Sequence, residues 1–280
     1  MGAIQTLADV IRETADRFLN DVSDRFRGSV RAIYRVSTDR ELPEHVGTCT
    51  LLEHGAERVL ITAAHVSDHS TQTSLYVGGA NSLVEIKDPF FATQAPDGNR
   101  DKDFFDFAVC RPRSETLEEL GDVTFMPSAL CADRSFPPGA NRLYGCLGFP
   151  NSKNKGIHAG SRSVKTVLWR YSSYAVAPPA LEGYPSTDQH HLFVDFDGKR
   201  AKTADGQVVN AIWPQGASGG PIFDMGDFGD KAIAFPDAVC QPRLAAILIQ
   251  KPAKAKVLMG VRIQAVLAGL ADRPAWRSHL

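Results

Sequence analysis

The sequence predicts an all-β protein of two packed small barrels, preceded by one amphipathic helix. Three observations support this fold class. The 280 residues include 23 glycines and 17 prolines, a density of turn formers that favours many short elements over a few long helices. Short β-like runs recur between turn signals from residue 29 to residue 263. A stretch of helical character divides these runs into two groups, which indicates two β-rich halves.

Composition places the chain among ordinary folded proteins. Hydrophobic residues make up 43% and charged residues 22%, which excludes disorder as the main state. A net charge of −1 gives no general attraction to nucleic acid or to anionic lipid, so neither is expected as a partner. No apolar run approaches the roughly 18 residues that would span a bilayer.

The first expected element is an amphipathic helix over residues 4–26, within an N-terminal segment 1–28. Its apolar residues recur at helical spacing, with charged residues on the other faces. These apolar positions are Ile4, Leu7, Ile11, Phe18, Val22 and Phe26. We expect the helix to pack on the main domain. The alternative is that it docks a regulatory protein partner.

The first barrel is expected over residues 29–113, and its strands are predicted by short apolar and alternating runs. The predicted strands cover residues 29–36, 47–53, 57–62, 74–77, 83–87 and 105–110. A tight turn is expected at His54 and Gly55. A linker, 114–134, follows. It opens with a short helix over 114–121, because this run begins with a serine cap, has acidic residues in its first turns and ends with glycine.

The second barrel is expected over residues 135–270, followed by a tail over 271–280. The predicted strands cover residues 142–148, 163–172, 191–196, 207–212, 221–223, 244–250 and 257–263. A short helix over 264–270 closes this half of the chain.

The five cysteines indicate a reducing compartment. They are odd in number, widely scattered and without a Cys-x-x-Cys spacing, which argues against a disulfide framework and against a structural zinc site. They are Cys49, Cys110, Cys131, Cys146 and Cys240. Acidic residues also interrupt the N-terminal apolar positions before a signal peptide could form. We therefore expect a cytoplasmic protein.

Three short motifs contain residues suited to nucleophilic catalysis. His65 ends the run Thr-Ala-Ala-His, Asp106 opens the apolar run Asp-Phe-Ala-Val, and Ser218 lies in Gly-Ala-Ser-Gly-Gly-Pro. A serine hydroxyl is a poor nucleophile until a base takes its proton as it attacks. Imidazole titrates near neutrality, so it can take that proton and later return it. A carboxylate beside the imidazole fixes its tautomer.

These motifs, in this order, resemble those of the trypsin-like serine peptidases of the chymotrypsin fold, and the resemblance covers residues 29–270. It implies two six-stranded barrels and a serine endopeptidase that acts on polypeptides without metal or cofactor. His65 would be the general base and acid, Asp106 the orienting acid and Ser218 the nucleophile. The backbone N–H groups of Gly216 and Ser218 would form the oxyanion hole. Asp101 and Asp103 lie close to Asp106 and are its nearest rivals.

Departures from the family pattern are also informative. Secreted members usually have a cysteine directly after the histidine, where this chain has Val66, and an aspartate just before the serine, where it has Ala217. The chain is therefore more similar to intracellular or bacterial members. The resemblance places Ile212 at the floor of the specificity pocket. An apolar residue there favours small or medium apolar side chains on the acyl side of the cut.

Two other motif interpretations fail against the sequence. Gly-x-Ser-x-Gly is also the nucleophile elbow of α/β-hydrolases, but there the histidine follows the serine, and His279 is the only later histidine. His65 and His69 could share a metal on a helix, yet Val66 occupies the place of the glutamate that a zinc peptidase uses.

Two functional alternatives to an active peptidase remain open. The first is a protease-fold binding module that is catalytically idle or gated by a partner. The second is an esterase or other acyl hydrolase on the same fold.

Overall fold

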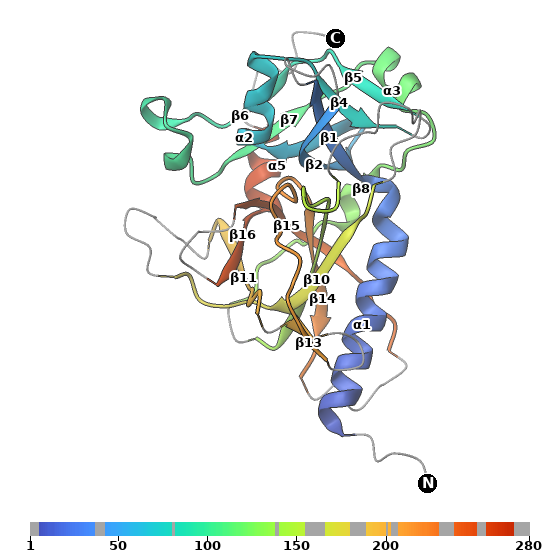
Figure 1. The fold of residues 1–280 in the computed structure, drawn as a ribbon, viewed down its shortest axis with the longest axis vertical. Helices are drawn as coiled ribbons and strands as arrows, with labels where there is room; N and C mark the ends of the chain where they lie inside the picture. Colours follow the sequence, from blue (N-terminus) through green and yellow to red (C-terminus); the bar gives the residue numbers. More distant parts are fainter. Residues whose placement is uncertain are drawn as a thin grey trace.

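The computed structural model describes residues 6–36, 43–79, 82–137, 140–154, 166–179, 189–199, 201–202, 207–229, 238–250 and 256–271. Two curled antiparallel sheets lie one above the other, with a long helix along the side of the lower sheet (Figure 1). The predicted fold class, mostly β with an N-terminal and a short C-terminal helix, is confirmed. None of the helices described is both long and apolar enough to cross a bilayer.

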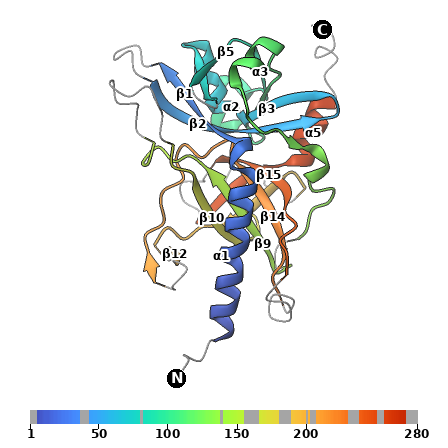
Figure 2. The same cartoon turned by 90° about the vertical axis from the view of Figure 1, so that its right-hand side faces the viewer.

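Helix α1 (Leu7–Phe26) packs against strands of the second sheet. It begins with a capping box, in which the Thr6 hydroxyl accepts the Asp9 N–H and the Asp9 carboxylate accepts the Thr6 N–H. Its buried face includes Phe18 and Phe26, and the Phe26 ring stacks on that of Phe223 with centroids 4.5 Å apart. The helix crosses β9, β10 and β14 (Figure 2). A partner for its outer face stays a prediction.

The first sheet contains the six predicted strands and two further short ones, which makes eight. Their order is β5-β4-β1-β2-β3-β7-β6, and β8 pairs in parallel with β2. The strands are β1 (Val30–Val36), β2 (Pro43–His54), β3 (Glu57–Ala63), β4 (Leu75–Gly78), β5 (Leu83–Ile86), β6 (Phe90–Ala92), β7 (Phe107–Cys110) and β8 (Met126–Pro127). β6 and β8 were not predicted, because two or three residues are too few for an alternating pattern. Over the described residues no pairing joins β5 to β6, so the sheet is curled and open.

The segment expected to link the barrels contributes both a helix and a strand. The helix is α3 (Ser114–Leu120), and Gly121 follows it with a positive φ of 67°. This agrees with the predicted helix and its terminal glycine. The predicted serine cap is wrong, because Ser114 is the first helical residue and Arg113 occupies the cap position without a side-chain hydrogen bond. The strand is β8, which joins the first sheet.

The second sheet has the expected six strands in the order β10-β9-β14-β15-β16-β11. The strands are β9 (Arg142–Gly148), β10 (Trp169–Tyr174), β11 (His191–Asp195), β14 (Pro221–Asp227), β15 (Arg243–Gln250) and β16 (Val257–Arg262). Helix α5 (Ile263–Ala271) follows, close to its predicted place. The first residues of the strand expected over 163–172 lie outside the described part of the chain.

The strand expected over 207–212 is wrong in its length. Only β13 (Val208–Val209) is extended and paired, with β12 (Ala201–Lys202), in a small separate sheet. Residues 210–214, which follow it, lie outside any strand, and Pro214 is among them. Proline has no N–H for a sheet ladder, which is consistent with a loop here.

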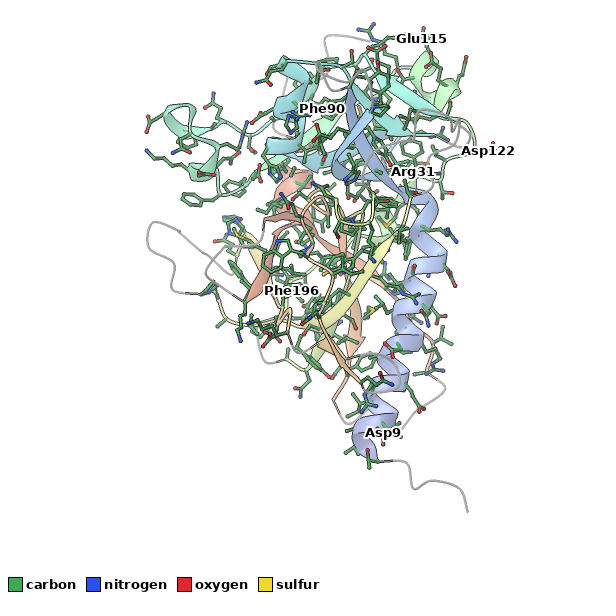
Figure 3. The ribbon with its side chains drawn as sticks, viewed as in Figure 1. Asp9, Arg31, Phe90, Glu115, Asp122 and Phe196 are labelled. Carbon is green, nitrogen blue, oxygen red and sulfur yellow. The ribbon has the colours of Figure 1, made fainter. Side chains whose placement is uncertain are left out.

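Three apolar clusters make up the described core. One fills the first sheet and includes Leu51 and Leu60, and another fills the second and includes Ile222 and Leu248. The largest joins the two sheets and α1, and includes Ile61 and Ile247. Side chains fill the space between the sheets (Figure 3). This shared core holds the two sheets together where the predicted site residues lie.

Candidate active site

Two successive tight turns surround Ser218. In the first, the Ala217 N–H donates to the Pro214 carbonyl over 2.8 Å, and Gly216 is the third residue with a φ of 93°. In the second, the Gly220 N–H donates to the Ala217 carbonyl over 2.9 Å, and Gly219 again has a φ of 93°. A type II turn requires a positive φ at its third residue, which glycine adopts without steric cost. The glycines therefore determine the backbone course on both sides of the serine.

Strand β2 of the first sheet holds the serine loop of the second. The Thr48 N–H donates to the Ser218 carbonyl and the Thr48 hydroxyl to the Gly216 carbonyl, each over 2.9 Å. The Thr50 hydroxyl donates to the Gly219 carbonyl, also over 2.9 Å. No motif in the sequence marks these threonines. Their spacing of two, which places both side chains on one face of a strand, was the only signal.

We expect Thr48→Val to destabilise the protein more than Thr50→Val. The buried Thr48 hydroxyl also accepts the Phe149 N–H over 3.0 Å, so valine leaves two buried groups unpaired instead of one. An unpaired buried polar group costs about 1–3 kcal/mol. Urea unfolding should show a loss of about 2–4 kcal/mol for Thr48→Val and about half of that for Thr50→Val. Equal losses would contradict this account.

His65 and Asp106 form a close pair. His65 lies in α2 (Ala64–Ser67), directly after β3, and its Nδ1 is 2.6 Å from Asp106 Oδ2. Asp106 Oδ1 accepts the backbone N–H of His65 over 2.9 Å. Burial raises the pKa of the Asp106 carboxyl, and the hydrogen bonds from His65 oppose that rise. With Nδ1–H donating to the carboxylate, Nε2 carries the lone pair that a general base needs.

Asp103 supports the loop that presents Asp106. Asp103 Oδ1 accepts the backbone N–H groups of Phe105 and Asp106, over 3.1 and 3.0 Å. Asp106 has a positive φ of 38°, a backbone conformation that costs energy for any residue but glycine. Of the rival acids, Asp103 is buried behind Asp106 and Asp101 is exposed. The acid hydrogen-bonded to His65 is Asp106.

His65 and Ser218 line one cleft of about 550 Å³ between the two sheets. Within the described residues, the side-chain hydrogen bond of His65 runs to Asp106 and none joins its ring to Ser218. The amide N–H groups of Gly216 and Ser218 have no hydrogen-bond acceptor among these residues. The cleft thus offers a base, a hydroxyl and two backbone donors to a molecule bound in it.

The two walls of the cleft differ in chemistry. The first half of the chain contributes Arg35 of β1 and His69 of the turn after α2, which lie 3.0 Å apart between Nη1 and Nδ1. The second half contributes the apolar Leu248 and Leu258, together with the polar Asn151 and Gln215. Ile212 lines a different cavity of about 950 Å³, beside α1 and β10. Its assignment to the specificity pocket stays a prediction.

His45 is a buried histidine behind the Gly216 turn that the sequence analysis did not single out. It is 4% exposed, and its Nδ1 is 2.6 Å from Asn151 Oδ1. The Asn151 N–H donates to the Gln215 carbonyl over 2.7 Å. A side chain added at Gly216 would place its Cβ 2.0 Å from Asn151 Oδ1, so the pair lies directly against this turn. Burial lowers the pKa of His45 from 6.5.

This lowered pKa predicts a loss of stability in mild acid. Below pH 6.5 the unfolded state binds a proton at His45 that the folded state takes up less readily, so the free energy of unfolding falls as pH drops. His45→Gln keeps a donor for Asn151 and cannot titrate. Urea unfolding across pH 7.5 to 5 should show a smaller fall for this variant. An unchanged pH dependence would contradict the assignment.

The described parts of the chain hold no group of three or more histidine, cysteine, aspartate or glutamate side chains that could bind a metal ion. No protein-family model matches the chain. No curated protein matches it either.

Solved structures similar to this chain include Rv3671c from M. tuberculosis H37Rv. An inactive form matches with 15% identity and a TM-score of 0.49 over 92% of each chain. The active form, described as a protease, matches with 15% identity and a TM-score of 0.48 over 90% of this chain and 83% of that one. The serine protease domain of the Sesbania mosaic virus polyprotein matches with 17% identity and a TM-score of 0.47, over 87% and 92%.

Proposed function

We propose that this chain is a serine endopeptidase. The observation that carries the proposal is the hydrogen-bonded pair of His65 and Asp106, whose histidine lines the same cleft as Ser218. Ser218 Oγ attacks the carbonyl carbon of a bound peptide while His65 Nε2 takes its proton. His65 then returns the proton to the leaving amine, and an acyl-enzyme on Ser218 remains. Water hydrolyses this ester through the same base.

The oxyanion formed in each step would be stabilised by backbone donors. The N–H groups of Gly216 and Ser218 flank the nucleophile and have no acceptor within the described residues. Donors that are already in place need no rearrangement as charge develops on the carbonyl oxygen. The two glycine turns keep this backbone in position.

The substrate is a polypeptide with a small or medium apolar side chain on the acyl side of the cut. The apolar wall formed by Leu248 and Leu258 supports this preference, and the Glu44 carboxylate that also lines the cleft is already paired with Arg35. Selectivity among apolar side chains would be modest, about 1–3 kcal/mol per methylene. Profiling with a peptide library tests the preference. Dominant cleavage after arginine or lysine would contradict it.

A partner-gated binding module is the second candidate. It is favoured by the lack of a hydrogen bond between the His65 ring and Ser218 within the described residues. Treatment with a fluorophosphonate probe and mass spectrometry separates the two functions. An active peptidase gains one adduct, on the peptide that contains Ser218. A gated or idle module stays unlabelled under the same conditions. An esterase would also label, and assays on protein and ester substrates identify it.

We also propose a reducing, cytoplasmic location. All five cysteines are free thiols, and four of them are buried. Burial raises the pKa of Cys146 and Cys240 to about 12, which keeps both thiols protonated and unreactive. Thiol titration of anaerobically purified protein should count five in denaturant without reductant. A count of three or fewer would contradict the proposed compartment.

A further inference from the structure

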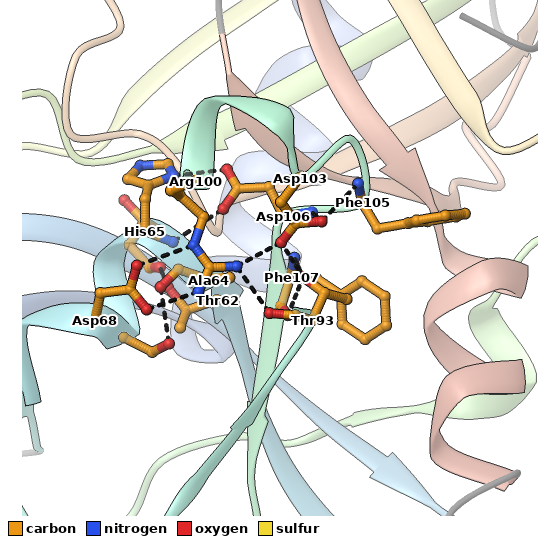
Figure 4. Close-up of polar contacts among 12 residues, drawn as sticks. Thr62, Ala64, His65, Asp68, Thr93, Arg100, Asp103, Phe105, Asp106 and Phe107 are labelled. Atoms are coloured by element: carbon orange, nitrogen blue, oxygen red, sulfur yellow. Dashed lines mark hydrogen bonds and ion pairs between the residues drawn. The ribbon is translucent and has the colours of Figure 1, made fainter. Parts of the chain in front are cut away.

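Arg100 joins the two segments that carry the candidate base and its acid (Figure 4). Its Nε and Nη2 donate to the two carboxylate oxygens of Asp68, over 2.9 and 2.8 Å. Its Nη1 donates to Asp103 Oδ2 over 2.5 Å and to the Thr93 carbonyl over 2.8 Å. One guanidinium group thus binds two carboxylates and a backbone carbonyl at once.

Each carboxylate lies next to a residue of the pair. Asp68 follows α2, three residues after His65, and begins a short 3₁₀ turn. Asp103 Oδ1 accepts the N–H groups of Phe105 and Asp106, while its Oδ2 accepts from Arg100. The guanidinium therefore connects the backbone after the base to the loop that sets the acid.

The Asp106 loop depends on such support. Asp106 has a φ of 38°, and a residue in this conformation keeps it only when its surroundings hold it there. The Asp103 side chain is 4% exposed, so its charge needs a partner. The planar guanidinium can satisfy both carboxylates in fixed directions, whereas an ammonium group is a single point charge.

We propose that Arg100 is a positioning residue of the active site. By binding Asp103 and Asp68 at the same time, it holds the Asp106 carboxylate within hydrogen-bond distance of His65. Arg100 does not line the cleft, so it acts on the reaction only through this pair. The consequence for catalysis rests on the proposed peptidase function. The expected change in the geometry of the His65–Asp106 pair does not depend on that function.

The test compares Arg100→Met with Lys102→Met. Lys102 lies in the same turn, but its exposed ion pair is with Asp97 and involves neither Asp68 nor Asp103. We expect Arg100→Met to lower kcat by about 10- to 100-fold with little change in KM, because small displacements of a catalytic group cost this much. Lys102→Met should behave as wild type. The kcat of Arg100→Lys should lie between those of the wild type and of Arg100→Met.

Fluorophosphonate labelling separates positioning from general loss of structure. Displacement of Asp106 lowers the rate constant of labelling, but all of the protein is labelled in the end. Irreversible misfolding of part of the protein lowers the final labelled fraction and leaves the rate constant of the folded part unchanged, and the thermal unfolding midpoint reports any reversible loss of structure. If Arg100→Met does not fold, Asp68→Asn provides the same comparison, since it weakens only the bonds between Arg100 and Asp68.

A double-mutant cycle tests whether Arg100 acts through Asp106. Arg100→Met added to Asp106→Asn should cause no further loss, because the group that it positions is already gone. Additive losses, or wild-type kinetics in Arg100→Met, would overturn the proposal. If the wild-type chain does not label at all, the peptidase function fails. In that case the low-field NMR signal of the His65 Nδ1–H proton tests the positioning role of Arg100. The signal should weaken in Arg100→Met and persist in Lys102→Met.

Discussion

Replacing Ser218 with alanine is expected to remove nearly all peptide hydrolysis and all fluorophosphonate labelling while the fold persists. The remaining rate should exceed that of the uncatalysed reaction by about 10³–10⁴-fold, since the backbone donors and the cleft stay in place. The Ser218 side chain is half-buried, and the loop is held by its backbone through Thr48. The midpoint of thermal unfolding should therefore stay close to that of the wild type.

The matched controls for this experiment are a remote serine and the base. Ser114→Ala, at the exposed start of α3, should keep full activity and full labelling. His65→Ala should lose about as much activity as Ser218→Ala, and the double variant should lose no more than either, because the two groups act as a unit. Wild-type hydrolysis by Ser218→Ala would show that the nucleophile lies elsewhere.

Asp106→Asn is expected to lower kcat by about 10⁴-fold. An asparagine amide can donate to His65 Nδ1, and the imidazole then carries its proton on Nε2, where the lone pair is needed. The substitution is nearly isosteric, so KM and the unfolding midpoint should change little. Steady-state kinetics with a peptide substrate measure the effect.

Asp103→Asn is the control for the choice of acid. The amide oxygen can still accept the N–H groups of Phe105 and Asp106, whereas the amide nitrogen cannot accept from Arg100 or from the Thr93 hydroxyl, as Asp103 Oδ2 does. We expect a loss of about tenfold in kcat, as for a small displacement of Asp106. If Asp103→Asn were crippling and Asp106→Asn harmless, Asp103 would be the acid.

Much of the fold could be predicted because most of its elements have strong local patterns. Strand β9 covers the predicted range 142–148, and α3 and α5 end within one residue of their predicted ends. Alternating or continuous apolar runs bounded by turn residues carry that information in a short window. Strands β6 and β8 are too short for such a pattern, and their pairing depends on neighbours from elsewhere in the chain.

The sequence by itself determined the candidate nucleophile, base and acid, because Ser218, His65 and Asp106 each lie in a motif of distinctive local composition. The tertiary structure alone decided what holds them. Thr48 donates to a carbonyl 168 residues away, and Arg100 to a carboxylate 32 residues away. Threonine and arginine are common in any polar segment, so no window of sequence distinguishes these two. Their roles arise only when packing of the two sheets brings distant segments within hydrogen-bond distance, where directional bonds between buried groups set the geometry of the site.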